Sequence, residues 1–170
     1  MKKLILFAVV IIFLFSGCSK NGTGNFQIYL KDQPLDIESA DKIEVTISEI
    51  SVQKAEEGFL NVWSGEKTYD LRELMIQDEM ILDITLEEGK YTQIRLVVTE
   101  GKIYFSGEPL DMTVASTEVK IPLNFDISDG STTRITLDFD AKDSIHVVSA
   151  GGSGQYILRP VVRVENISYE

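Results

Sequence analysis

The chain contains few of the residues that build disulfides, metal centres and nucleic-acid interfaces. Its 170 residues include one Cys, one His and one Trp, and 27 acidic side chains outnumber 16 basic ones. A single Cys excludes an internal disulfide and any metal site made of several thiolates. A formal net charge of −11 argues against a nucleic-acid partner, because binding to phosphates needs a basic surface.

Motifs of catalysis and cofactor binding are missing as well. His146, the only histidine, has no Gly-x-Ser-x-Gly or comparable nucleophile motif to act with, and no glycine-rich phosphate loop occurs. Paired carboxylates for glycoside hydrolysis are an alternative, but no particular pair stands out among 27 acidic residues. We therefore predict a protein that is not an enzyme and has no cofactor, apart from the calcium hypothesis below.

The N-terminus has the pattern of an export signal. Lys2 and Lys3 precede an unbroken apolar run over residues 4–15, which is followed by Ser16-Gly17-Cys18. A basic start, a short apolar stretch and small residues at a cleavage site predict a secretory signal peptide over residues 1–17. The run is shorter than the ~20 apolar residues of a membrane-spanning helix. An uncleaved N-terminal anchor is the alternative.

Residues 14–18, Leu-Phe-Ser-Gly-Cys, resemble the bacterial lipobox, in which the Cys is acylated and the chain is cut just before it. Phe15 departs from that pattern, which usually has Leu there. Two acyl chains, such as palmitate, anchor a protein stably in a membrane. The resemblance implies a lipoprotein held in a cell envelope through lipid on Cys18, with its domain facing the periplasm or the exterior. A free structural Cys is the alternative.

The rest of the chain is predicted to form one β domain. Residues 18–25 read as a lipidated Cys and a flexible tether, because they are polar and Gly-rich, and residues 26–170 suit a single core. From Phe26 onward apolar and polar residues alternate with a period of two, which predicts strands with one wet face. Many such strands predict an all-β fold, an antiparallel β-sandwich of immunoglobulin-like or prealbumin-like type.

Two pairs of strands are predicted to form β-hairpins. One pair is 119–127 and 134–140 around a turn at 128–131, and the other is 80–86 and 94–98 around a turn at 87–90. Gly130 can supply the positive φ of a tight turn. A further turn is predicted at Glu100-Gly101.

Three irregularities are predicted as well. Apolar residues change phase between Ile47 and Ile50, which predicts a β-bulge near Ser48-Glu49. Pro160 cannot donate a hydrogen bond to a sheet, so the last strand, 156–164, is predicted to lie at an edge or to be bulged. Residues 71–75 are the only predicted helical turn.

Six segments of the chain resemble a bacterial and archaeal family called domain of unknown function 4382. They are residues 30–36 with 43–52 and Tyr69-Asp70-Leu71 at its opening, 89–96 in its central strand, and 137–144 with 158–164 at its end. Members of that family are commonly lipoproteins, which agrees with Cys18. The family's function is not established, so the resemblance supports the fold and the location and implies no substrate.

Three aromatic residues are candidates for ligand contact or for structure. Trp63 and Tyr69 could stack on a sugar ring, because aromatic faces offer apolar area with a polar tip. The alternative is that the only Trp of a β domain belongs to the core. Tyr91 follows Gly89-Lys90 at a strand entrance, as in the tyrosine corner of immunoglobulin-like sandwiches, and a structural role is predicted for it.

Acidic residues gather at several points, and Asp138, Asp140 and Asp143 are the closest group. Calcium prefers six to eight hard oxygen ligands, so Asp-rich loops can bind it, with Asp140 and Asp143 the favoured ligands. The alternative is a solvated face on which Asp138 and Asp140 pair with nearby arginines. Those arginines are Arg95, Arg134 and Arg159. A second acidic group comprises Asp32, Asp36 and Asp41.

Together these features predict an envelope lipoprotein whose domain is a non-catalytic binding or scaffolding module. Its expected partners are the membrane, through the lipid on Cys18, and an envelope protein or polysaccharide. One alternative is a carbohydrate-binding or hydrolytic domain that uses surface Asp and Glu residues with Trp63. Another is a purely structural component of the envelope. The sequence identifies no ligand.

Overall fold

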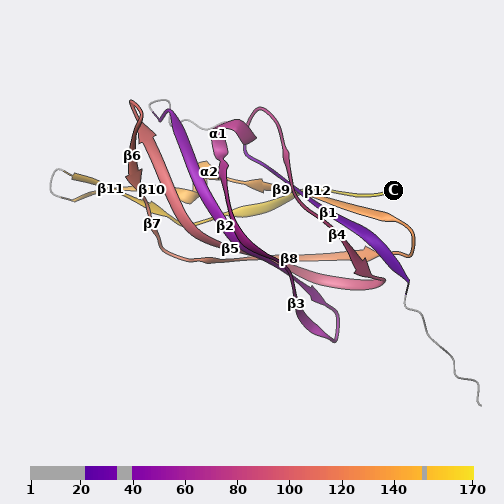
Figure 1. Cartoon of the computed structure of the whole chain (residues 1–170). Helices are drawn as coiled ribbons and strands as arrows, with labels where there is room; N and C mark the ends of the chain where they lie inside the picture. Colours follow the sequence, from indigo (N-terminus) through magenta and orange to yellow (C-terminus); the bar gives the residue numbers. More distant parts are fainter. Residues whose placement is uncertain (1–21, 34–39, 151–152) are drawn as a thin grey trace, which may run out of the picture.

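The computed structural model describes residues 22–33, 40–150 and 153–170. The predicted signal peptide and Cys18 therefore lie outside the described residues. The described chain forms strands and two short helices (Figure 1). They are β1 (Thr23–Lys31), β2 (Lys42–Lys54), β3 (Gly58–Asp70), α1 (Leu71–Leu74), β4 (Glu79–Glu87), β5 (Gly89–Phe105), β6 (Glu108–Asp111), β7 (Thr113–Val114), β8 (Glu118–Ile127), β9 (Thr132–Phe139), α2 (Ala141–Ser144), β10 (Ile145–Ala150), β11 (Ser153–Leu158) and β12 (Val162–Tyr169).

These strands form a β-sandwich, which confirms the predicted all-β class. The first sheet has the order β12-β9-β1-β4. The second sheet has the order β3-β2-β5, and both β6 and β8 pair with the free edge of the long strand β5. A small third sheet has the order β10-β11-β7. Pairing is mostly antiparallel, but β1 with β9 and β11 with β7 are parallel.

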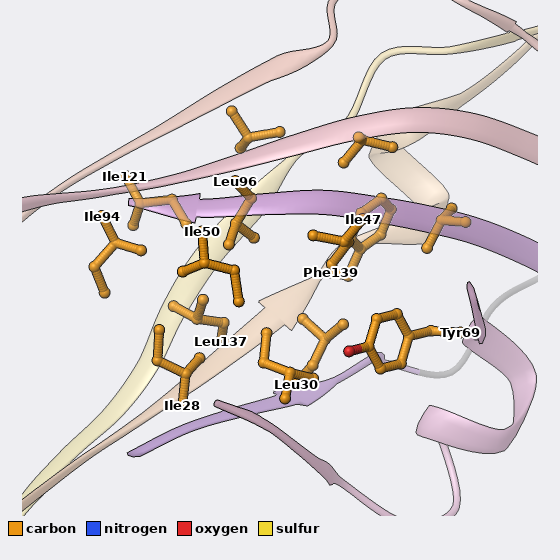
Figure 2. Packing of buried hydrophobic residues seen from close by; sticks show 14 of the residues in the cluster. Ile28, Leu30, Ile47, Ile50, Tyr69, Ile94, Leu96, Ile121, Leu137 and Phe139 are labelled. Atoms are coloured by element: carbon orange, nitrogen blue, oxygen red, sulfur yellow. The ribbon is translucent and has the colours of Figure 1, made fainter. Parts of the chain in front are cut away.

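The core lies between the first and second sheets, as the period-two pattern predicts. Phe26, Ile28 and Leu30 of β1 have no exposed surface, and the residues between them are partly exposed. Figure 2 shows Leu30 and Leu137 of the first sheet facing apolar residues of the second. Burying one such side chain contributes about 1.5–3 kcal/mol. One core of this kind accounts for the stability of the sandwich without a disulfide.

Two local predictions are confirmed. The pairing of β2 with both neighbouring strands skips Ser48, so the β-bulge lies where the phase of apolar residues changes, and Ile47 and Ile50 are both buried. The helical turn at 71–75 is α1, where the Asp70 carboxylate caps the helix by accepting a hydrogen bond from the Arg72 backbone N–H at 3.0 Å. It is not the only one, because α2 is a second helix of the same length.

Both predicted hairpins are wrong in their pairing, although their strands and turns form. β8 pairs with β5 and β9 pairs with β1, so the turn at 128–131 connects the two sheets. β4 pairs with β1 and β5 with β2, so the turn at 87–90 does the same. A connection between sheets and a hairpin both place alternate residues in the core, so alternation does not distinguish them. Gly130 does adopt a positive φ of 69°.

The predicted turn at Glu100-Gly101 is also wrong, because β5 continues through it. A glycine is needed there for another reason. A Cβ on Gly101 would lie 2.7 Å from Leu158 Cδ2 and 2.9 Å from Met112 Cε. The glycine therefore permits the third sheet to approach the second.

The two ends of the domain differ from prediction by a few residues each. β1 begins at Thr23, so residues 23–25 belong to the sheet and the predicted tether is shorter than 18–25. The predicted strand 156–164 is two strands, β11 and β12, which separate around Pro160 and join different sheets. In the described part of the chain, no helix is long and apolar enough to span a membrane.

Candidate functional site

The sandwich has two ends, which β1 connects. The first residue of β1, Thr23, lies beside Glu87 and the turn that follows β4. We call this end of the sandwich the tether end. The last residue of β1, Lys31, lies near α1 at the opposite end (Figure 1). There a cavity of about 430 Å³ opens between the end of β1, the segment that follows α1, and β12. We call this the cavity end.

Asp32 lines this cavity and is almost completely buried, with 3% of its surface exposed. Asp32 directly follows β1 and lies two residues after the buried Leu30, so the alternation of the strand places its carboxyl group on the core side. Its Oδ1 accepts hydrogen bonds from the backbone N–H groups of Gln33 at 2.9 Å and Ala141 at 3.2 Å. Its Oδ2 has no hydrogen-bond partner among the described residues.

Burial raises the pKa of Asp32 to about 7, because a buried carboxylate loses its hydration. The two backbone N–H donors oppose this shift, and the negative charge of Asp138 adds to it. Asp32 therefore exchanges its proton close to neutral pH.

Asp138 is the second buried carboxyl, with 2% of its surface exposed. It lies opposite Lys31 in the pairing of β1 with β9. Its Oδ2 accepts a hydrogen bond from Gln33 Nε2 at 2.8 Å, and its Oδ1 has no partner in the described structure. Burial raises the pKa of Asp138, and the Lys31 charge opposes that shift. Gln33 thus joins the two carboxyls, through its backbone to Asp32 and through its side chain to Asp138.

The two unpaired oxygens are energetically unfavourable. A buried acceptor without a donor costs about 1–3 kcal/mol. The one cation of the cavity wall, Lys31, is already paired, because its Nζ lies 2.6 Å from Glu165 Oε1. A protein tolerates such groups where they serve a ligand or a proton. The cavity end is therefore the candidate site.

The structure separates the predicted aromatic pair. Tyr69 is 3% exposed and its ring lies in the core near Leu30 (Figure 2). Burial raises its pKa to about 12. Trp63 is partly buried and packs against the core from β3. The two residues do not form an exposed aromatic platform. The structure favours the core alternative given for Trp63, and Tyr69 belongs to the core as well.

The three predicted calcium ligands lie in different environments. Asp138 is buried and accepts a hydrogen bond from Gln33 Nε2, so the interpretation of Asp138 and Asp140 as a shared solvated face is wrong. Asp140 caps α2 by accepting from the Asp143 N–H at 2.9 Å. Arg163, not one of the three arginines considered, pairs with the carboxylates of both Asp140 and Asp143. Within the described ranges, no three His, Cys, Asp or Glu side chains are grouped to hold a metal ion.

Tyr91 has the structural role predicted for it. Its side chain is 1% exposed, and its hydroxyl donates a hydrogen bond to the Glu87 carbonyl at 3.0 Å. The bond closes the turn between β4 and β5 at the tether end. Burial raises the pKa of Tyr91.

The spacing of acidic residues in the sequence groups Asp32 only with Asp36 and Asp41. The signal that could have singled it out is its phase, because Phe26, Ile28, Leu30 and Asp32 fall on one face of an alternating strand. A carboxyl in that phase predicts a buried titratable group at the end of the strand.

One comparison with known proteins matches most of the sandwich, from β1 to the end of β11. A family model described as Domain of unknown function (DUF4382) matches residues 23–160, from the first residue of β1 to just beyond β11. Asp32, Gln33 and Asp138 lie inside the matched range, whereas Glu165 in β12 lies after it. No curated protein and no solved structure matches the chain.

Proposed function

Since the chain belongs to the family described as Domain of unknown function (DUF4382), which names no activity, we propose a function from its own geometry. The protein is a lipid-anchored, non-catalytic binding module of a cell envelope, and the cavity end is its ligand site. One observation carries this proposal: β1 leads from the tether end directly to the buried carboxyls.

Distances along the chain support the arrangement. Cys18 precedes Thr23 by five residues, so a lipid on Cys18 holds the start of β1 within ~18 Å of the membrane surface. From Thr23 to Lys31 the strand rises ~26 Å. The ligand site then points away from the membrane, where a partner in the surrounding space can reach it.

Charge supports the same orientation. The tether end carries Glu88 and Asp129, and Asp129 accepts a hydrogen bond from the Thr23 N–H at 3.0 Å, whereas Glu87 is paired with Lys54 at 2.8 Å. Acidic groups near a membrane are repelled by anionic headgroups. Attachment therefore depends on the lipid, and the protein domain is held at a distance from the membrane surface.

Binding is favoured over hydrolysis by the placement of the two carboxyls. A glycosidase needs two carboxyl groups that flank the scissile bond of a bound substrate. Asp138 does not line the cavity, which is lined by Asp32, Asp78 and Glu165. Of these, Asp32 is almost completely buried and Glu165 is paired with Lys31. Asp138 instead accepts a hydrogen bond from the side chain of Gln33, whose backbone N–H donates to Asp32. This arrangement suits a residue that positions Asp32 and does not itself contact a ligand.

Fractionation of cells tests the anchor. Wild-type protein should pellet with membranes, and Cys18→Ala should be found in the soluble fraction while retaining the β-rich circular-dichroism spectrum. Pelleting of the folded Cys18→Ala protein would contradict the proposal.

Labelling tests the orientation. Cys18 is the only natural cysteine, and acylation consumes its thiol, so an introduced cysteine is the single labelling site. A fluorophore on Glu88→Cys, at the tether end, should be quenched by a quencher on lipid headgroups. The same fluorophore on Gln77→Cys, at the cavity end, should be quenched much less. Equal quenching at both positions would overturn the arrangement.

A further inference from the structure

The cavity beside Asp32 adjoins a second one. The second cavity has a volume of about 390 Å³ and lies beside α1 and the start of β4. Ile76, Gln77 and Asp78 line both cavities. A ligand that crosses this shared segment can therefore occupy the two cavities together.

The two cavities are strongly acidic. Six carboxyl side chains line them against one cation, Lys31. Lys31 is paired with Glu165, and Glu79 is paired with Lys67 at 2.7 Å. The four acidic residues that remain are Asp32, Asp70, Glu73 and Asp78. Their combined field attracts cations into the region.

Asp32 gives this region a built binding group. Its Oδ2 is buried and lacks a partner among the described residues, while its Oδ1 is fixed by two backbone N–H groups. An ammonium group that donates to this carboxyl would supply the missing hydrogen bond. A charge-assisted bond of this kind is about twice as strong as a neutral one.

Ile76 adds an apolar contact between the acidic groups. It is 87% exposed, the largest exposed fraction among the large hydrophobic residues described. Because it lines both cavities, it lies where the middle of a bridging ligand would pass. Alkyl carbons laid against it lose contact with water, which is favourable.

From these features we infer that the cavity end binds a linear aliphatic polyamine. One ammonium group bonds to Asp32 in the first cavity, the alkyl chain crosses Ile76, and a second ammonium group lies among Asp70, Glu73 and Asp78 in the second. This inference rests on the proposed function, because it takes the cavity end as the ligand site.

Isothermal titration of the full-length protein in neutral detergent at pH 8 with spermidine tests it. Spermidine should bind saturably, and Asp32→Asn and Asp78→Asn should each weaken binding about tenfold. Asp78 is exposed, so its variant reports on binding even where Asp32→Asn disturbs folding. Glu66→Gln removes one charge from exposed β3, outside both cavities, and should change the affinity less than twofold.

A second probe separates shape from charge. Hexaamminecobalt(III) carries the same three positive charges as spermidine but has no alkyl chain, so it should bind more weakly and should not respond to Ile76→Ser. The same substitution should weaken spermidine binding severalfold. Equal effects of Glu66→Gln and Asp78→Asn, or equal affinity for the two cations, would overturn the inference. Absence of saturable spermidine binding overturns this inference alone, because the anchoring and labelling experiments use no ligand.

Discussion

At the tether end the loops bond to one another, whereas at the cavity end two carboxylate oxygens have no hydrogen-bond partner among the described residues. The Glu88 N–H donates to the Gly22 carbonyl at 2.8 Å, the Gly130 N–H donates to the Thr23 carbonyl at 2.9 Å, and Tyr91 closes the turn between β4 and β5. Buried polar groups in stable structures are normally satisfied in this way.

The core differs between the two ends as well. Near the tether end, the Phe125 ring stacks on Phe26 and on Tyr91, with centroids 5.2 Å apart in both pairs. Near the cavity end, the row of buried residues along β1 ends with the carboxyl group of Asp32. One end is therefore built for stability, and the other gives up stability to keep a titratable group buried. Such local costs are typical of functional sites.

The largest effect is expected from Phe125→Ala, at the stable end. Phe125 is 2% exposed, and truncation of a buried Phe costs about 3–5 kcal/mol through lost burial and the cavity left behind. Urea unfolding should show this loss. Leu110→Ala, which truncates a residue 46% exposed in β6, is the control and should cost less than ~1 kcal/mol. Similar losses in the two variants would contradict the comparison of the ends.

The second largest effect is expected in the pH dependence of the free energy of unfolding, to which Asp32 contributes. Its pKa is about 7 in the folded protein and 3.8 as the ordinary value. Between these values the folded chain holds a proton that the unfolded chain has released. Stability therefore falls as pH rises from about 4 to 7, by on the order of 4 kcal/mol for the full shift.

Asp32→Asn removes this titration, so the free energy of unfolding should depend less on pH between 5 and 8 than in the wild type. Asp83→Asn, an exposed change in β4, should leave the wild-type slope. Urea unfolding at a series of pH values measures both. Parallel curves for Asp32→Asn and wild type would show that Asp32 is not the buried titrating group.

Alternation in the sequence predicted the strands, the core residues and the bulge in β2, because each depends only on which face a residue takes. It could not predict which strands pair. The core-facing residues of β8 and β9 are compatible both with a hairpin and with a connection between two sheets. Which of the two arrangements forms depends on hydrogen bonds to strands that are distant in the sequence.

The site was predictable only in part for the same reason. The phase of Asp32 could be read from β1, but its burial depends on Ala141, which lies 109 residues later and donates to its Oδ1. The pairing of Asp140 with Arg163 likewise depends on the return of β12 beside β9. Long-range contacts of this kind leave no local pattern in the sequence.

A smaller loss is expected for Tyr91→Phe at the tether end. The variant keeps the stacked ring and loses the hydrogen bond to the Glu87 carbonyl. Such a bond contributes about 0.5–1.5 kcal/mol, which should lower the urea midpoint slightly. Tyr169→Phe, at a residue 55% exposed near the C-terminus, should leave the midpoint unchanged. A midpoint for Tyr91→Phe equal to that of the wild type would show that this bond does not stabilise the tether end.

The smallest effect is expected for Arg163→Met at the cavity end. The Arg163 side chain is 51% exposed, and exposed ion pairs contribute less than ~1 kcal/mol. Asp140 still caps α2 in the variant, so Tm should fall by only a few degrees. Calcium should not raise the Tm of the wild type, because the guanidinium group occupies the oxygens that calcium would need. A rise with calcium would favour the calcium hypothesis for Asp140 and Asp143. A large loss in Arg163→Met would show that this pair holds the cavity end together.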